Sequence, residues 1–367
     1  MFSKETIAGL KKSIRQGKVC SGPIDLQILP TTRCNENCVF CPTQAVSKSA
    51  KEKFAKRWLV EETDLNFGVF DRMIDDLYRL GGIKRIHLTG GEPLLHKRMM
   101  AIIFLLRRSF PAAEIALVTN GILLPNFAQA LALSGLDRIG ISVNAGTEKS
   151  FAEQTRVAGS NLEKIGQGIK LIRRHRDEKS LGKPYLSMTA VLNRHNFQEV
   201  EELTKFGIDS GAEAVSWLAL MDFPFPGERP KEFALSEKEF QEFQKEMTRL
   251  QPRAKQKGIY LGFTGAPEHL GKLRAGDLYH KVRCYSGYSF AMVWPDGSVR
   301  PCCNCETSLG NLREQSFYRI WNSSRAQEIR ERMLKITEQG PPDLCDCAEC
   351  GYLYENQEFQ RLMKKNE

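Results

Sequence analysis

Short runs of β-branched and aliphatic residues alternate with longer amphipathic stretches over the first 220 residues. The short runs predict strands, and stretches with apolar residues three to four positions apart predict helices. The predicted strands cover residues 24–29, 85–88, 115–119, 139–143, 186–192 and 215–220. The predicted helices cover residues 71–80, 99–107, 126–133, 162–175 and 197–207. Six strands alternating with helices indicate an α/β fold with a parallel sheet and right-handed crossovers.

The alternation stops at residues 221–230, which contain three prolines and two phenylalanines. This composition favours neither helix nor strand, so we expect either a linker or a stiff apolar loop at the mouth of the sheet. Its polar side chains are candidate catalytic residues: Asp222, Glu228 and Arg229. A polar helix is expected over 236–256 and a hairpin turn over 294–301. We therefore expect an α/β part over 1–230, a helical linker over 231–280 and a hairpin-and-helix part over 281–367.

The composition is that of a soluble globular protein, with 367 residues, 41% hydrophobic and 26% charged. No apolar run approaches the roughly 20 residues that span a bilayer, and the first residues resemble no secretory signal. We therefore expect a cytoplasmic protein without a membrane partner. Eleven cysteines in such a chain indicate metal binding or redox work rather than disulfides, because the cytosol keeps thiols reduced.

The formal net charge of +9 raises the question of a nucleic-acid partner. The basic residues are, however, scattered among acidic ones, and no dense basic tract with interleaved aromatic residues is found. Nucleic acid is therefore not expected to bind. The charge instead favours anionic small molecules slightly.

Three cysteines, Cys34, Cys38 and Cys41, follow the first predicted strand with the spacing C-x3-C-x2-C. A [4Fe–4S] cluster has four irons, so three thiolates leave one iron open to a cofactor. A zinc knuckle is the alternative, because C-x2-C is common in zinc sites. With Phe40 just before the third cysteine, the motif resembles the signature of the radical S-adenosylmethionine (SAM) superfamily, in which the amino acid end of SAM chelates the open iron.

The resemblance implies a partial (β/α)6 TIM-type barrel and a SAM site at the carboxyl ends of its strands. The segment Thr89-Gly-Gly-Glu-Pro93 follows the second strand and resembles the element that holds the SAM amino group. Polar residues near the ends of strands four and five match positions that hold the SAM ribose and carboxylate. The expected SAM-binding residues are Phe40, Gly90, Gly91, Glu92, Ser142, Asn144, Arg156 and Asn193. Each can alternatively be a turn, a strand-end polar residue or a helix cap.

The C-terminal part contains a second set of cysteines, Cys284-x17-Cys302 followed by Cys347-x2-Cys350. Four thiolates can close around a second [4Fe–4S] cluster, and a zinc ribbon is the alternative. The spacing resembles the "twitch" half of the SPASM domain and lacks the further cysteine run of a full one, which implies a single auxiliary cluster. The remaining cysteines are Cys20, a candidate buried hydrophobe, and Cys303, Cys305 and Cys345, of which Cys345 competes with Cys347 as a ligand.

The resemblance predicts an oxidoreductase that cleaves SAM to a 5′-deoxyadenosyl radical and removes hydrogen from a substrate. A donor such as flavodoxin or ferredoxin would supply the electron. The auxiliary spacing resembles that of 2-deoxy-scyllo-inosamine dehydrogenases, which favours oxidation or dehydration of a small sugar or aminocyclitol. Only 33 residues precede Cys34, too few for a winged-helix leader-recognition domain. The alternatives are a peptide maturase that crosslinks or epimerises, with Cys303 or Cys305 as hydrogen donor, and a non-enzymatic iron–sulfur or zinc protein.

Overall fold

A single ten-stranded sheet organises the chain, with the order β10-β9-β8-β1-β2-β3-β4-β5-β6-β7. The computed structural model describes residues 3–41, 63–220, 233–264, 281–342, 345, 347 and 350–364. From β8 through β1 to β7 every neighbouring pair is parallel, while β9 and β10 continue as an antiparallel edge. The strands are β1 (Asp25–Ile28), β2 (Arg85–Leu88), β3 (Glu114–Thr119), β4 (Arg138–Ser142), β5 (Tyr185–Leu192), β6 (Ala214–Ala219), β7 (Tyr260–Thr264), β8 (Phe290–Val293), β9 (Ser298–Arg300) and β10 (Gly310–Asn311).

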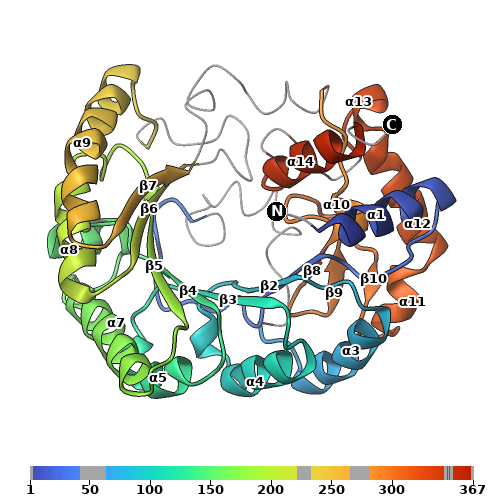
Figure 1. Ribbon diagram of the computed structural model, residues 1–367, viewed down its shortest axis with the longest axis horizontal. Helices are drawn as coiled ribbons and strands as arrows, with labels where there is room; N and C mark the ends of the chain where they lie inside the picture. The colour runs from blue at the N-terminus through green and yellow to red at the C-terminus, as the bar shows by residue number, and fades with distance from the viewer. Residues whose placement is uncertain are drawn as a thin grey trace.

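Helices cover the convex side of this curved sheet, as Figure 1 shows for α3, α4, α5, α7, α8 and α9. The helices that precede β7 in the chain are α1 (Lys4–Gln16), α3 (Phe67–Leu80), α4 (Met99–Ser109), α5 (Leu124–Ala132), α6 (Glu148–Thr155), α7 (Asn161–Glu178), α8 (Val200–Ser210) and α9 (Glu237–Gln256). The later ones are α10 (Ser286–Ser289), α11 (Phe317–Trp321), α12 (Ser324–Leu334), α13 (Ile336–Gln339) and α14 (Leu353–Lys364), and a 3₁₀ turn, η1, covers Pro93–Leu95. None of the described helices has the length and apolar character required to cross a membrane.

The two faces of the sheet differ because side chains alternate along each strand. On β2 and β3, Ile86, Leu88, Ile115 and Leu117 face the helices and have no exposed surface. Their neighbours on the other face are more open, and Val118 is 38% exposed. The helix side is therefore the hydrophobic core, and among the described residues the concave side carries the more exposed side chains.

The predicted α/β fold is confirmed, and each of the six predicted strands matches β1 to β6 within one residue at either end. The helix predicted at 236–256 is α9, whose Ser236 and Glu239 form a capping box. The parallel sheet also includes β7 and β8, which were not predicted as barrel strands. β7 lies inside the expected linker 231–280, so this segment contributes to the sheet. The three-part division stays a prediction.

The C-terminal part is joined to the barrel by strand pairing and by buried polar contacts. β8 pairs in parallel with β1, and the predicted hairpin connects β8 to β9. The Tyr352 hydroxyl hydrogen-bonds Asp25 at the start of β1, and Arg85 forms an ion pair with the same carboxylate. Trp321 donates its indole N–H to the carbonyl of Ser21 at 2.9 Å. The C-terminal part is therefore held against the first barrel strand.

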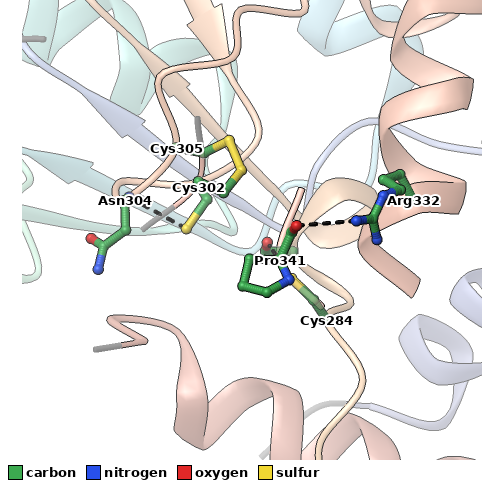
Figure 2. Close-up of a disulfide and its surroundings, with 8 residues drawn as sticks. Cys284, Cys302, Asn304, Cys305, Arg332 and Pro341 are labelled. Atoms are coloured by element: carbon green, nitrogen blue, oxygen red, sulfur yellow. Dashed lines mark hydrogen bonds between the residues drawn. A yellow bond between two sulfur atoms is a disulfide. The ribbon is translucent and has the colours of Figure 1, made fainter. Parts of the chain in front are cut away.

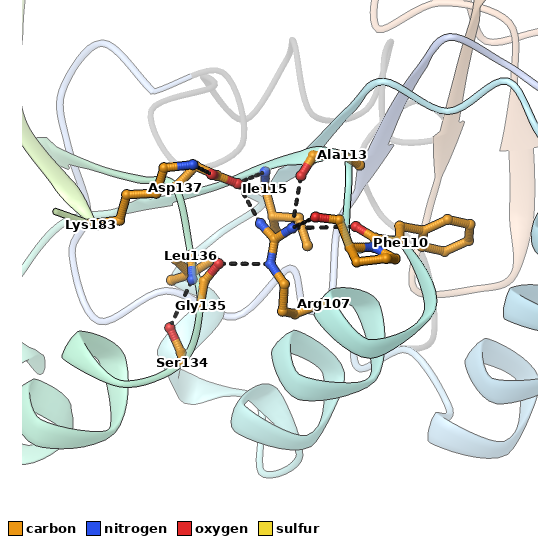
Figure 3. A network of polar contacts seen from close by, with 10 residues as sticks. Arg107, Phe110, Ala113, Ile115, Ser134, Gly135, Leu136, Asp137 and Lys183 are labelled. Carbon is orange, nitrogen blue, oxygen red and sulfur yellow. Dashed lines mark hydrogen bonds and ion pairs between the residues drawn. The ribbon is translucent and has the colours of Figure 1, made fainter. Parts of the chain in front are cut away.

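A polar network around Asp137 ties α4, β3 and β4 together at the end of the barrel opposite the carboxyl ends of the strands (Figure 3). Asp137 accepts hydrogen bonds from Arg107, from Lys183 and from the N–H of Ile115. Burial opposes ionisation of this carboxyl, but its hydrogen bonds to Lys183 and Ile115 and the charge of Arg107 hold its pKa below the ordinary value. In a barrel of this type, such contacts at the amino-terminal end stabilise the fold.

We expect Asp137→Asn to lower the free energy of unfolding by about 1–3 kcal/mol at neutral pH, because Arg107 and Lys183 lose their charged acceptor. A lowered native pKa stabilises the fold above the unfolded pKa of about 3.9 and less as pH falls through the native pKa. The difference between the two proteins should therefore shrink below about pH 4. Urea titrations at several pH values measure it, with the exposed Asp75→Asn as control. Equal free energies of unfolding for the unchanged protein and Asp137→Asn at neutral pH would contradict a stabilising role for the Asp137 carboxylate.

Candidate functional site

The three-cysteine loop begins at the carboxyl end of β1 and lies against α6. The N–H groups of Asn37 and Val39 donate to the carbonyls of Thr155 and Gln154, each at 2.9 Å. Within the loop, the N–H of Cys41 donates to the carbonyl of Cys38 at 3.1 Å. The end of α6 therefore determines the path of the loop, which the sequence alone did not indicate. Phe40 is half-buried between the second and third cysteines.

Gly90 and Gly91 pack against the peptide that leads into the cysteine loop. A Cβ atom on Gly91 would lie 2.2 Å from the carbonyl oxygen of Arg33, and one on Gly90 would lie 2.5 Å from that of Thr31. Gly90 also has a φ of 142°, which glycine tolerates and other residues rarely adopt. Hydrogen bonds from Gly91 N–H to Thr31 and from Glu92 N–H to Arg33 join the two segments. Within the described structure, the glycine pair therefore accommodates the start of the cysteine loop.

Glu92 is completely buried and bonded to three donors of the protein. Its Oε1 accepts from the N–H of Leu94 at 3.0 Å and from the hydroxyl of Thr119 at 2.8 Å, and Oε2 accepts from the N–H of Asn120 at 2.7 Å. Burial raises the pKa of Glu92, and the three hydrogen bonds oppose that rise. The carboxylate thus connects the turn after β2 to the end of β3. The contact of Glu92 with the SAM ammonium stays a prediction.

We expect Glu92→Gln to destabilise the protein by about 1–3 kcal/mol even without SAM, because its amide places a donor among three donors. SAM affinity should fall as well, since the turn beside the cysteine loop is no longer held. Denaturation of the SAM-free protein and SAM titration of the reconstituted protein measure the two effects. Unchanged stability with reduced SAM affinity would instead indicate direct contact with SAM.

Asn120 is a site residue that the sequence analysis missed. It stands at the end of β3, and its amide donates to Oδ1 of Asn35 at 2.6 Å and lies 3.9 Å from Sγ of Cys34. Its own N–H binds Glu92. The signal that could have found it is a polar residue directly after a buried strand, at the edge where parallel strands end.

Asn144 and Asn193, which were predicted near the ends of strands four and five, belong to a buried network. Asn144 accepts the N–H of Val191 at 2.8 Å, and its carbonyl accepts the amide of Gln154 at 2.9 Å. Asn193 has no exposed surface, and its amide donates to Gln154 at 3.0 Å and to the carbonyl of Val191. Because Gln154 also binds the cysteine loop through its carbonyl, these residues support that loop. The SAM contacts predicted for Asn144 and Asn193 stay predictions.

Two further predicted residues remain accessible. Ser142 is half-buried at the end of β4, and the side chain of Arg156 is exposed. Arg156 is the C-cap of α6, with a left-handed φ of 55°, directly after the Thr155 carbonyl that binds the cysteine loop. Both stay candidates for SAM binding. The predicted catalytic candidates Asp222, Glu228 and Arg229 lie outside the described residues.

The four cysteines predicted to hold the auxiliary cluster line one pocket of the C-terminal part: Cys284, Cys302, Cys347 and Cys350. Ser286 and Asn356 are among its other lining residues. The N–H of Asn304 donates to Sγ of Cys302 at 3.4 Å (Figure 2). Arg332 binds the carbonyls of residues 339–341 and so holds the chain that leads back to Cys345. Segments about 60 residues apart in the sequence therefore meet at this pocket.

The surplus cysteines behave differently from the prediction, because Cys305 and Cys345 form a disulfide (Figure 2). The expectation that the chain contains no disulfide is wrong for this pair, which the fold places opposite one another in an isolated antiparallel bridge. In this state Cys345 offers no thiol to compete with Cys347. Cys20 is exposed, so its predicted role as a buried hydrophobe is also wrong.

In each set the thiols are partly buried and lie close enough for their charges to interact. Burial, with Glu36 and Cys41 nearby, raises the pKa of Cys34 to about 11, so iron binding must displace its proton. Burial also raises the pKa of Cys350, and the charges of Cys302, Cys284 and Cys347 add to the rise. The thiols of each set are thus near neighbours.

No three His, Cys, Asp or Glu side chains among the described residues converge closely enough to share one ion. The four ligands of a zinc ion each lie about 2.3 Å or less from it, whereas a cubane places its ligands on separate irons.

Comparisons with known proteins agree with this arrangement. Residues 28–207 match the family model described as Radical SAM superfamily, and residues 284–351 match SPASM, an iron–sulfur cluster-binding domain. A GTP 3′,8-cyclase of Peptoclostridium acidaminophilum is 30% identical over 200 residues, 54% of this chain and 55% of the relative. The chain thus spans about half the length of the curated relatives that it matches first. A GTP 3′,8-cyclase of Thermodesulfovibrio yellowstonii is 27% identical over 330 residues, 88% of this chain and 92% of the relative.

Solved structures share the fold at low identity. Streptococcus suis SuiB bound to the precursor peptide SuiA has a TM-score of 0.62 at 16% identity, over 88% of this chain and 70% of that chain. The protein anSMEcpe with bound AdoMet has a TM-score of 0.60 at 16% identity, over 94% of this chain and 95% of that chain. The predicted family and the predicted cofactors, SAM and [4Fe–4S] clusters, are confirmed. The chain thus consists of a radical SAM domain over residues 28–207 followed by a SPASM iron–sulfur cluster-binding domain over residues 284–351.

Proposed function

We propose that this enzyme removes a hydrogen atom from a small polar substrate of the sugar or aminocyclitol class and completes the reaction as an oxidation. Bound at the loop of Cys34, Cys38 and Cys41, SAM supplies a 5′-deoxyadenosyl radical on one-electron reduction. The four cysteines of the C-terminal pocket hold an auxiliary cluster as electron acceptor. A base would remove the accompanying proton from the substrate.

A row of hydroxyls on the concave face of the sheet carries the proposal of a polar substrate. Ser142 of β4 pairs with Thr189 of β5, which pairs with Ser216 of β6, so the three side chains stand side by side. All three are half-buried, and their hydroxyls have no hydrogen-bond partner among the described residues. A hydroxyl both donates and accepts, which suits the hydroxyl and amino groups of such a substrate.

The barrel residues position SAM in this proposal. The carbonyls of Thr155 and Gln154 hold the cysteine loop, and Glu92 holds the turn beside it. We assign the exposed guanidinium of Arg156, next to Thr155, to the SAM carboxylate. Ser142 lies at the end of the row nearest β3, so we assign it to the SAM ribose. Thr189 and Ser216 are then left for the substrate.

A second candidate, a peptide maturase, is favoured by apolar side chains on the same face. Val118 is 38% exposed and Leu218 is 37% exposed. Both alternate with residues that face the helices, so they stand on the concave side. Apolar side chains of a peptide could pack there. A relationship to SuiB at 16% identity is one of fold and does not favour this candidate by itself.

Deuterium transfer tests the two candidates directly. The anaerobically reconstituted enzyme is incubated with SAM, a reductant and either C-deuterated aminocyclitols and amino sugars or deuterated peptides. We expect deuterium in 5′-deoxyadenosine with a member of the first group, because hydrogen removed from carbon moves to the deoxyadenosyl group. Transfer from peptides only would establish the maturase. A protein that never releases 5′-deoxyadenosine would contradict both candidates.

We expect Thr189→Val to raise the KM for the polar substrate about tenfold, because one hydrogen bond of about 1–1.5 kcal/mol is lost. Thr189→Ser keeps the hydroxyl and serves as the matched control, with a KM close to that of the unchanged enzyme. Steady-state kinetics under anaerobic conditions measure both variants. An unchanged KM in Thr189→Val would remove the hydroxyl row from substrate binding.

A further inference from the structure

Two buried polar side chains in the auxiliary pocket make their contacts with cysteine sulfurs. Asn356 of α14 is 2% exposed, and Ser286 of α10 has no exposed surface. Both line the pocket together with the four cysteines. Polar groups buried this deeply normally form a hydrogen bond, because a buried polar group without one lowers the stability of the fold by about 1–3 kcal/mol. Here the amide nitrogen of Asn356 and the hydroxyl of Ser286 lie beside the sulfurs of candidate cluster cysteines.

The orientation of the Asn356 amide is determined by the backbone. Its Oδ1 accepts the N–H of Tyr285 at 2.8 Å, so Nδ2 must point the other way, and it lies 3.7 Å from Sγ of Cys350. The amide nitrogen of Asn356 therefore lies beside the sulfur of one of the four candidate cluster cysteines.

Ser286 lies beside the sulfur of a second of these cysteines. Its hydroxyl oxygen lies 3.1 Å from Sγ of Cys284. A thiolate bound to iron has no proton to donate, so with the cluster in place the hydroxyl must be the donor. The backbone N–H groups of Ser286 and Asn304 also reach the sulfurs of Cys284 and Cys302. The side-chain donors are the ones that substitution can remove.

We propose that Asn356 and Ser286 donate hydrogen bonds to the ligand sulfurs of the auxiliary cluster and thereby raise its reduction potential. Reduction adds one negative charge that is shared by the thiolates, so donors stabilise the reduced state more than the oxidised state. An apolar, buried pocket has the opposite effect, because it disfavours added charge. The two side chains therefore favour electron uptake. This inference rests on the proposed function, in which the cluster accepts an electron.

An electrochemical titration followed by electron paramagnetic resonance tests the proposal without substrate. The full chain carries Cys34→Ala, Cys38→Ala and Cys41→Ala, so one cluster gives the signal. We expect Ser286→Ala and Asn356→Leu each to lower the ratio of reduced to oxidised cluster about 3- to 10-fold at a fixed applied potential, the effect of one hydrogen bond. Because no substrate is present, the result does not depend on whether the enzyme oxidises sugars or modifies peptides.

Ser289→Ala is the matched control for the serine variant. Ser289 is equally buried in the same helix, but its hydroxyl donates to the carbonyl of Tyr285 instead of a ligand sulfur. The reduction potential of the auxiliary cluster in the Ser289→Ala protein should equal that in the protein that carries only the three cysteine substitutions. If Asn356→Leu lowers the iron content, the reduction potential of the Ser286→Ala protein alone tests the proposal. A fully loaded Ser286→Ala protein with an unchanged potential, or an equal shift in Ser289→Ala, would overturn the proposal.

Discussion

Replacing Cys34, Cys38 and Cys41 together by alanine is expected to halve the iron content of anaerobically reconstituted protein, from about eight to about four irons per chain, and to abolish SAM cleavage. The three thiols stand on one loop at the carboxyl end of β1, whereas the other cluster thiols line a pocket of the C-terminal part. Loss of the first set removes the open iron and leaves the second set intact. Iron and sulfide analysis and assay of 5′-deoxyadenosine measure both effects.

Cys20→Ala is the matched control, because this exposed thiol belongs to neither set and contacts Gln16 and the carbonyl of Lys18. It should keep about eight irons and full SAM cleavage. A triple variant with unchanged iron content, or an unchanged protein with stoichiometric zinc and no labile sulfide, would contradict two cubane clusters in this chain.

Cys284→Ala is expected to separate hydrogen removal from product formation. Its thiol lies in the auxiliary pocket, and the cysteine loop is held by other residues, Thr155 and Gln154. The variant should therefore release 5′-deoxyadenosine in the presence of substrate and form less than about a tenth of the matching product. The measurement is the ratio of the two compounds in one anaerobic reaction.

Cys302→Ala is the parallel variant, but a second thiol, that of Cys303, lies next to the substituted position. Its neighbour Cys303 is close enough that their hydrogen bond, together with burial, raises the pKa of Cys302. Cys303 can therefore replace the lost ligand, and this variant should lose less product than Cys284→Ala. Normal product yield from a Cys284→Ala protein shown by spectroscopy to lack the second cluster would reject electron transfer to that cluster and favour redox-neutral dehydration or epimerisation.

The local elements and the chemistry of this protein were largely determined by the sequence alone. The strands β1 to β6 were predicted because buried strands are short apolar runs bounded by turns, a signal carried by neighbouring residues. The candidate cluster cysteines were equally accessible to prediction, since the spacings within each motif are three to eighteen positions. The capping box of α9 is likewise a local signal, from Ser236 and Glu239. Such patterns need no knowledge of what lies across the sheet.

The partners of these residues were decided only by the tertiary structure. Glu92 meets Thr119 and Asn120 because β2 and β3 are neighbours, and Asn356 meets Tyr285 because α14 returns to α10. The addition of β7 and β8 to the sheet and the pairing of Cys305 with Cys345 have the same origin. Each depends on contacts between segments distant in the chain, so no pattern within one segment encodes it. The sequence thus identified the candidate side chains, and the packing decided which residues hold them in place.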